Sequence, residues 1–269
     1  MQILEHGQAQ ERTLLFFPCT AEPVWAFADT ITLLSQRWHV FQVVYDGHQP
    51  EYPGDFTSVE QTVDEVISYL KSHGVSRLGG AYGCSMGGSI ALMTALGQKI
   101  RIRHCVMDGG ITPYQLPWIV TRFIALKDYL MMMIGRMGGV GLLEKAFATD
   151  DYSREDLQYV ADVLRHCSRK TLWRTFDSCN NYKVPDLLPA IDTQIHYWYA
   201  KDEEKERKKD LRYMKTKFPQ TQFEVLPDLG HGGLVLQKPE LFVEMILLVL
   251  VSYLILTVKA IRLDKMLML

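Results

Sequence analysis

The chain has 269 residues, of which 48% are hydrophobic and 22% charged, and its formal net charge is −2. This size allows one large globular core with room for an inserted lobe. The small net charge provides no overall attraction for nucleic acid, so we expect no nucleic-acid partner. Five cysteines without a C-x-x-C pair argue against a zinc site and favour a reducing compartment. With no signal-peptide pattern at the N-terminus, we expect a cytoplasmic protein.

Short apolar segments alternate with longer amphipathic segments over the first 108 residues. The capping box Thr57-Ser58-Val59-Glu60 predicts the start of one helix, which His73-Gly74 ends. Strands and helices that alternate at this spacing indicate a mostly parallel sheet with helices on both faces, an α/β fold. The predicted strands are 13–17, 39–45, 77–81 and 103–108, and the predicted helices are 24–34, 59–72 and 89–96.

The alternation stops between Thr112 and Ala190. We interpret residues 113–190 as an inserted helical lobe, with helices at 118–134, 153–164 and 168–176, and residues 1–112 and 191–269 as the core. A glycine-rich break is expected at 135–141. The first helical stretch carries apolar residues that could form either the lobe's own core or a substrate wall: Trp118, Ile119, Phe123, Leu130, Met131, Met132, Met133 and Met137.

The α/β pattern resumes after the lobe, with strands at 194–199 and 222–226 and a highly charged helix at 204–218. The most apolar run is 241–258, which has 14 uncharged residues after Glu244, fewer than the ~20 needed to span a membrane. We expect its first half to be a helix packed on the sheet. The segment from Val251 to Leu269 could be a further buried or interface segment, or could serve membrane-surface association or dimerisation.

A glycine-flanked serine stands between the third predicted strand and the following helix, in the run Gly83-Cys84-Ser85-Met86-Gly87. Because neither glycine has a Cβ, the strand and the helix can approach closely around Ser85. The Met86 amide would then lie at a helix N-terminus, which suits an oxyanion. The alternative is a glycine-rich turn that only packs.

Over roughly residues 13–245 the chain resembles the α/β-hydrolase superfamily. The resemblance rests on the Ser85 turn, the Asp46-Gly47-His48 loop, the helical insertion and the loop Gly230-His231-Gly232. It implies the α/β-hydrolase fold with a helical cap. It also implies the order Ser, acid, His, with Ser85 as nucleophile and His231 as general base.

The acid is ambiguous because Ala200 occupies the place of the glycine that usually precedes it. The family's three-residue spacing favours Glu203, whereas residue type favours Asp202, and Asp108 remains a third candidate. Alternatively, this charged run could be only a solvated helix face.

The resemblance also implies two oxyanion donors, the Met86 amide and a second amide from the loop after the first strand. Pro18-Cys19 replaces the usual His-Gly there, so Cys19 and Thr20 are both candidates for the second donor. We interpret the cysteine side chains themselves as packing residues.

These features predict a serine hydrolase of the carboxylesterase or lipase type that forms an acyl-enzyme and needs neither metal nor cofactor. Its expected partner is a small, apolar ester, with Trp118 and Met132 as candidate substrate-binding residues. An amidase, a thioesterase or a carbon–carbon hydrolase could use the same triad. An inert binding protein of this fold is the alternative from another class.

Overall fold

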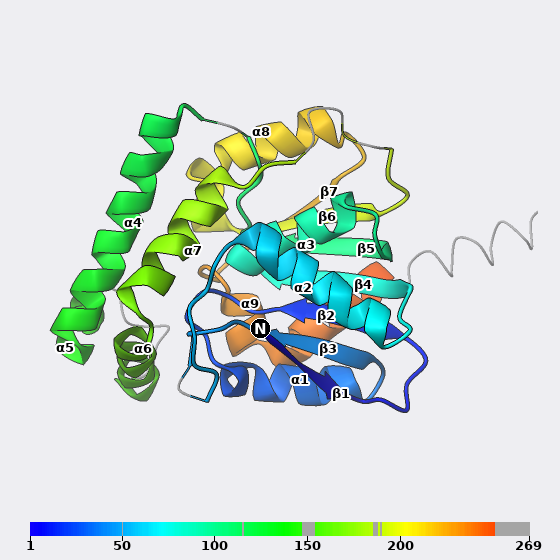
Figure 1. Ribbon diagram of the computed structural model, residues 1–269, viewed down its shortest axis with the longest axis horizontal. Helices are drawn as coiled ribbons and strands as arrows, with labels where there is room; N and C mark the ends of the chain where they lie inside the picture. Colours follow the sequence, from blue (N-terminus) through cyan, green and yellow to red (C-terminus); the bar gives the residue numbers. More distant parts are fainter. Residues whose placement is uncertain (50, 115, 147–153, 185–187, 189, 251–269) are drawn as a thin grey trace, which may run out of the picture.

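The computed structural model describes residues 1–49, 51–114, 116–146, 154–184, 188 and 190–250 (Figure 1). In this part of the chain seven strands form one sheet in the order β1-β3-β2-β4-β5-β6-β7. All neighbouring strands are parallel except β1 and β3. The strands are β1 Gln2–His6, β2 Thr13–Phe17, β3 His39–Val44, β4 Arg77–Cys84, β5 Arg101–Asp108, β6 Gln194–Ala200 and β7 Gln222–Leu226. The predicted α/β fold with a mostly parallel sheet is confirmed.

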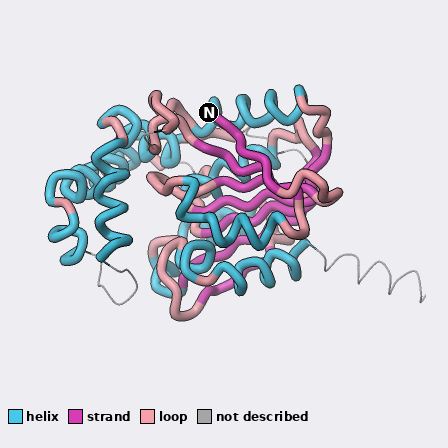
Figure 2. The backbone as a smooth tube through the Cα atoms, turned by 90° about the horizontal axis from the view of Figure 1, so that it is seen from below, coloured by secondary structure: helices cyan, strands magenta, loops and turns pink. Residues whose placement is uncertain are grey.

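Helices cover both faces of the sheet (Figures 1 and 2). One face packs against α2 (Val59–Ser72), α3 (Met86–Leu96) and α8 (Lys208–Lys217). The other packs against α1 (Ala28–Ser35), α9 (Gly233–Gln237) and the helix at 239–250. Phe242, Val243 and Ile246 of this last helix are buried against the sheet, so the first half of the apolar run forms part of the core.

Four further helices gather beyond the ends of β4 and β5, at one end of the sheet (Figure 2). They are α4 (Trp118–Gly138), α5 (Val140–Ala146), α6 (Arg154–His166) and α7 (Arg169–Asn181). Their common core includes Leu143, Leu157, Ala161 and Leu164, and it also contacts Ala21 from the loop after β2. The helical segment thus has its own small cluster and contacts the sheet domain through that loop and through α7, whose Cys179 lies in the main core and whose Ser178 hydroxyl accepts a hydrogen bond from the Val59 amide of α2.

Several local predictions are wrong in detail. The edge strand β1 and the short helix α9 were not predicted, and the helix expected at 24–34 begins as a 3₁₀ turn over Val24–Phe27. Ser58, rather than Thr57, caps α2, because its hydroxyl accepts a hydrogen bond from the Gln61 amide. The expected glycine break comes later, since α4 runs through Gly135 and ends at Gly138.

Most of the apolar residues of α4 do not form the core of the helical segment, which was one of their two predicted roles. Met132 and Met133 pack against the helical cluster, but most of the others face solvent. The exposed members are Trp118, Ile119, Phe123, Leu130, Met131 and Met137.

In the described ranges, no helix is both long and apolar enough to cross a membrane. The predictions for 251–269 fall outside those ranges.

Candidate active site

The turn after β4 holds Ser85 in an unfavourable backbone conformation, with φ 55° and ψ −119°. The Ser85 amide donates a hydrogen bond of 2.7 Å to the carbonyl oxygen of Asp108 at the end of β5. A Cβ at Gly83 would collide with the carbonyl of Gly87, and one at Gly87 would collide with the carbonyl of Phe17. Only glycine fits on either side of Ser85, so the strain is maintained by close packing of three segments.

Helix α3 begins directly after Ser85, at Met86. The Gly88 amide donates to the Ser85 carbonyl at 3.0 Å. The Met86 amide comes earlier, and the first amides of a helix have no acceptor within the helix. The loop that contains Cys19 and Thr20 follows β2, whose last residue lies against the Ser85 turn. The predicted oxyanion donors therefore come from two neighbouring segments at the carboxyl edge of the sheet.

His231 and Glu203 form a close pair near this turn. The His231 Nδ1 atom lies 2.7 Å from Glu203 Oε1, and the two side chains are 39% and 10% exposed. Gly109 (φ 60°) runs directly beneath them, since a Cβ there would lie 2.8 Å from the imidazole and 3.4 Å from Glu203 Oε2. Because Gly109 follows Asp108, whose carbonyl holds Ser85, the pair lies beside the Ser85 turn.

The surroundings of Glu203 keep it ionised. Burial alone would raise the pKa of this carboxyl group, but the hydrogen bond to His231 and the charges of His231 and Arg207 outweigh it and lower the pKa. The amide of Ala200 also donates to Glu203 Oε2 at 3.3 Å. A carboxylate in this state can orient an imidazole and stabilise its protonated form.

The other two candidate acids are placed differently. Asp202 is exposed, although it is next to Glu203 on the 3₁₀ turn Lys201–Lys205. Asp108 is buried and accepts a hydrogen bond of 2.8 Å from the Tyr82 hydroxyl. Burial raises the pKa of Asp108 to about 6. In the described structure, Glu203 is the carboxylate that contacts His231.

Sequence reasoning missed Arg207, which contacts the largely buried Glu203. Its Nε atom is 3.3 Å from Glu203 Oε1, and its Nη1 atom is 3.7 Å from Asp210. Asp210 in turn accepts hydrogen bonds from the amide and hydroxyl of Thr112, at 2.7 and 2.9 Å. The i,i+4 spacing of Glu203 and Arg207 was the available signal, but it was attributed to a solvated helix face.

Two cysteines lie under the site. Gly232, the residue after His231, faces the sulfur atoms of Cys84 and Cys19, which would be 3.4 and 3.5 Å from a Cβ at this position. Both side chains are buried, and the pKa of the Cys84 thiol is raised by its hydrogen bond with Cys19 and by burial. A thiol with a raised pKa is a poor nucleophile, so both cysteines act as packing residues.

The two candidate substrate-binding residues lie in different surroundings. Trp118 is exposed, with the Arg122 guanidinium 4.9 Å from its ring, and Met132 packs into the core of the helical cluster. His48, from the loop after β3, is buried beside Tyr45 and Phe56. Burial lowers the pKa of His48 to about 4, so it is neutral near pH 7.

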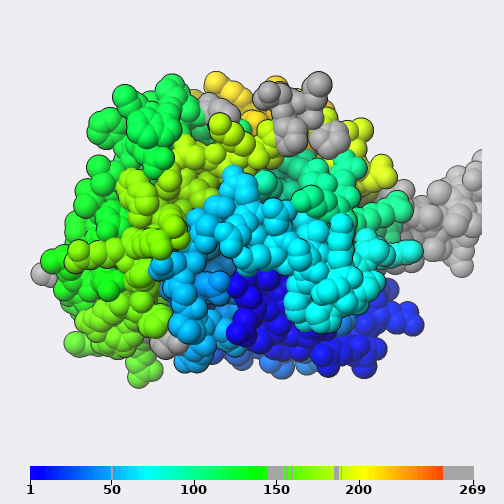
Figure 3. Space-filling view, in the orientation of Figure 1, coloured from blue at the N-terminus to red at the C-terminus, as the bar shows by residue number. Residues whose placement is uncertain are grey.

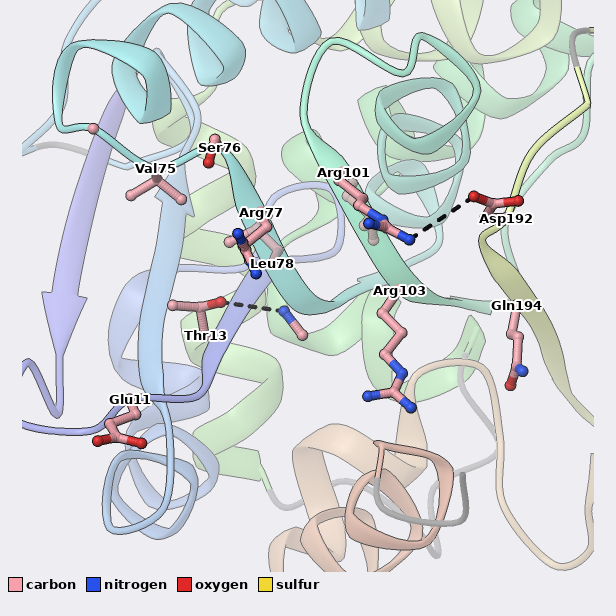
Figure 4. A pocket seen from close by; sticks show the side chains of 13 residues that line it. Glu11, Thr13, Val75, Ser76, Arg77, Leu78, Arg101, Arg103, Asp192 and Gln194 are labelled. Atoms are coloured by element: carbon pink, nitrogen blue, oxygen red, sulfur yellow. Dashed lines mark hydrogen bonds and ion pairs between the residues drawn. The ribbon is translucent and has the colours of Figure 1, made fainter. Parts of the chain in front are cut away.

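A groove of about 960 Å³ lies at the opposite edge of the sheet (Figure 4). Thr13, Arg77 and Arg101, which begin β2, β4 and β5, line it. Ser85 follows the far end of β4, about 25 Å along the strand at ~3.3 Å per residue. This groove is therefore separate from the Ser85 turn. Among the described residues, no cluster of His, Cys, Asp or Glu side chains could hold a metal ion.

Comparison with known proteins gives a family and a fold. The model of the alpha/beta hydrolase family matches residues 14–245. MenH from S. aureus is similar in structure, with a TM-score of 0.71 and 18% identity over 94% of this chain and 97% of that chain. A structure from a study of carboxylesterases of Nitrososphaera gargenis has a TM-score of 0.70 and 14% identity over 96% and 95%. The N-formylmaleamic acid deformylase from Pseudomonas putida S16 has a TM-score of 0.61 and 16% identity over 91% and 94%.

Proposed function

The chain belongs to the α/β-hydrolase family, and on that premise we propose that it is a serine hydrolase that cleaves a small, apolar carboxylic ester. The family match supports hydrolase activity in general terms. The ester and the serine mechanism rest on the residues around Ser85. The observation that carries the proposal is the 2.7 Å contact between His231 and the ionised Glu203, beside a serine on a strained strand-to-helix turn.

In the proposed mechanism, the Ser85 hydroxyl attacks the ester carbonyl carbon while His231 Nε2 takes the hydroxyl proton. Glu203 accepts a hydrogen bond from Nδ1–H, which fixes the tautomer that leaves Nε2 free to accept this proton. The negative charge that develops on the carbonyl oxygen is stabilised by the Met86 amide together with the amide of Cys19 or Thr20. His231 then gives its proton to the departing alkoxide, and an acyl-enzyme remains.

Water completes the reaction in the second half. His231 takes a proton from water, the hydroxide attacks the acyl-enzyme, and the Ser85 oxygen leaves with that proton. The exposed edge of His231 supports this step, because a half-exposed imidazole can be reached by water. No metal or cofactor takes part in this proposal.

The direct test is labelling with a fluorophosphonate probe, followed by a panel of p-nitrophenyl esters. Wild type is expected to label at Ser85 and to hydrolyse the esters, whereas Ser85→Ala should lose both, with kcat lower by about 10⁴-fold or more. Circular dichroism of the variant controls for folding. Equal turnover by Ser85→Ala would refute the mechanism, and a folded wild type that does not label would favour an inert binding protein.

The same preparation can separate the alternative substrates. Matched thioester and anilide substrates with the same acyl group should be slower than the ester in kcat/KM. A thioester or an anilide that is faster than its matched ester would replace the ester while leaving the triad in place.

A further inference from the structure

Helix α4 (Trp118–Gly138) is apolar on two opposite faces, but only one of them is covered. Its inner face packs Tyr129, Met132 and Met133 into the helical cluster. Its outer face lies at the edge of the molecule (Figures 1 and 3). A helix that is apolar all round is normally buried on all sides, so the outer face lacks the cover that its composition requires.

The uncovered face is a straight strip, which we call the α4 strip. Its residues follow one another at intervals of three or four, which places them one per turn along a single line over about 27 Å of helix. Phe123 and Met137 are 69% and 82% exposed. Among the exposed positions of α4, Lys127 is the one charged residue. The strip consists of Ile119, Phe123, Leu126, Leu130, Ile134 and Met137.

The area of the strip is large for a monomer. Its six side chains each expose more than a third of their surface. At roughly 100 Å² each they make an apolar patch on the order of 600 Å², at the upper end of the roughly 300–600 Å² found as the largest patch on typical monomers. A standard stable interface buries about 800 Å² per partner, so the strip would form most of one.

The strip is complementary to itself when two copies run in opposite directions. If the twofold axis crosses α4 near residue 128, Ile119 lies opposite Met137 of the second copy, and Leu126 lies opposite Leu130. Phe123 then meets Ile134, so every position is matched by an apolar one. This order along the helix allows the same patch to serve on both subunits, as a twofold interface requires.

We infer that the α4 strip is a homodimer interface, in which α4 packs antiparallel against α4 of a second copy. A narrow seam with one apolar residue per turn is typical of helix–helix packing. A membrane-surface helix would instead carry a broad apolar face bordered by several Lys and Arg residues. Among the exposed positions of α4, Lys127 is the one basic residue. The last described residue, Leu250, packs next to Gly80 in the first half of β4, whereas the helical segment lies beyond the other end of this strand.

Sedimentation velocity from 1 to 100 µM tests this interface, with Leu130→Lys as the disrupting variant. Wild type is expected to be a dimer, and Leu130→Lys should raise the dimer Kd by about 100-fold or more, because each dimer contains two of these lysines near its centre. The matched control is Leu241→Lys on the helix at 239–250, since Leu241 is 45% and Leu130 49% exposed. This control should leave the Kd unchanged. Circular dichroism checks folding, and Ile119→Lys replaces Leu130→Lys if the latter does not fold.

Crosslinking tests the antiparallel arrangement. The native cysteines are all buried, so an introduced cysteine is the accessible thiol within the described chain. Leu126→Cys mixed with a size-tagged Leu130→Cys should give the mixed disulfide on mild oxidation, in preference to either self-crosslink. A dominant Leu126→Cys self-crosslink would overturn the antiparallel geometry.

Three results would overturn the interface itself. They are a wild type that is monomeric at 100 µM, a dimer that persists in both folded lysine variants, and a monomer that floats with phosphatidylcholine–phosphatidylserine vesicles through the strip. The last result would assign the strip to a lipid surface. Esterase activity does not enter this test, so its outcome is independent of the proposed function.

Discussion

Replacing Glu203 with Gln tests the contact on which the proposed mechanism depends. The substitution keeps the size and shape of the side chain and removes its charge, 2.7 Å from His231 Nδ1. It also places a side-chain amide group, which can donate a hydrogen bond, beside His231 Nδ1, which should itself donate one. Both effects destabilise the protonated imidazole that forms in the transition state.

The size of the effect follows from the geometry. Charge centres about 4 Å apart interact by about 4 kcal/mol at an effective dielectric constant of ~20. Water at the exposed edge of His231 screens part of this, which leaves about 2–4 kcal/mol. We therefore expect kcat of Glu203→Gln to fall by about 30- to 1,000-fold. KM should change little, because Glu203 acts through His231 and does not reach the substrate.

The assay is steady-state hydrolysis of p-nitrophenyl butyrate at pH 8, with Asp202→Asn as the matched control. Asp202 is the neighbouring exposed carboxylate. Because solvent surrounds it, its variant should retain kcat within about twofold, a change of less than ~0.5 kcal/mol in the activation free energy. If Asp202→Asn is the crippling change, or if folded Glu203→Gln stays within threefold of wild type, the assignment of the acid is wrong.

Three further predictions concern the same site and helix α4. Arg207→Met should lower kcat by about three- to tenfold, because the Arg207 charge helps to hold the pKa of Glu203 low and its Nε atom lies 3.3 Å from Glu203 Oε1; an unchanged kcat would contradict this. Burial raises the pKa of Asp108 to about 6, so the folded chain keeps this proton at pH values where the unfolded chain has lost it. The free energy of unfolding should therefore fall as pH rises from about 4 to 6. Urea unfolding should therefore show wild type losing up to about 3 kcal/mol relative to Asp108→Asn between pH 4 and pH 8, and equal pH dependence of the two would contradict it. Phe123→Ala should leave the butyryl-to-acetyl preference within twofold, because Phe123 faces away from the helical cluster into solvent; a large shift would bring the α4 strip back as a substrate wall.

Most of the sheet could be predicted because its strands are buried on both faces and are therefore short, continuous apolar runs. Leu14–Phe17 and the carboxyl half of β5 are examples, and each is almost completely buried. The edge strand β1 (Gln2–His6) was missed because it is only half-buried and has a mixed composition. Its place depends on antiparallel pairing with β3, a long-range contact that no local pattern reveals.

The apolar pattern of α4 shows the limit of a periodicity argument. Spacing revealed that the segment is a helix with apolar residues, but not which face of it is covered. The inner face meets Leu143 and Leu164, which lie 10 or more residues away in α5 and α6. The outer face has an equally apolar pattern and meets nothing in the described structure, because burial is decided by where the other helices lie.

Glu203, the proposed acid, is best understood together with Arg207. A glutamate has one more rotatable bond than an aspartate, so ordering its carboxylate costs more side-chain entropy and needs more contacts. Glu203 has three of them, from His231, the Ala200 amide and Arg207. Arg207 is itself held by Asp210, which also accepts a hydrogen bond from the Thr112 amide between β5 and α4. Contacts through Arg207 and Asp210 therefore join Glu203 to the segment between β5 and α4. The charged run that resembles a solvated surface helix thus contains a buried ion pair.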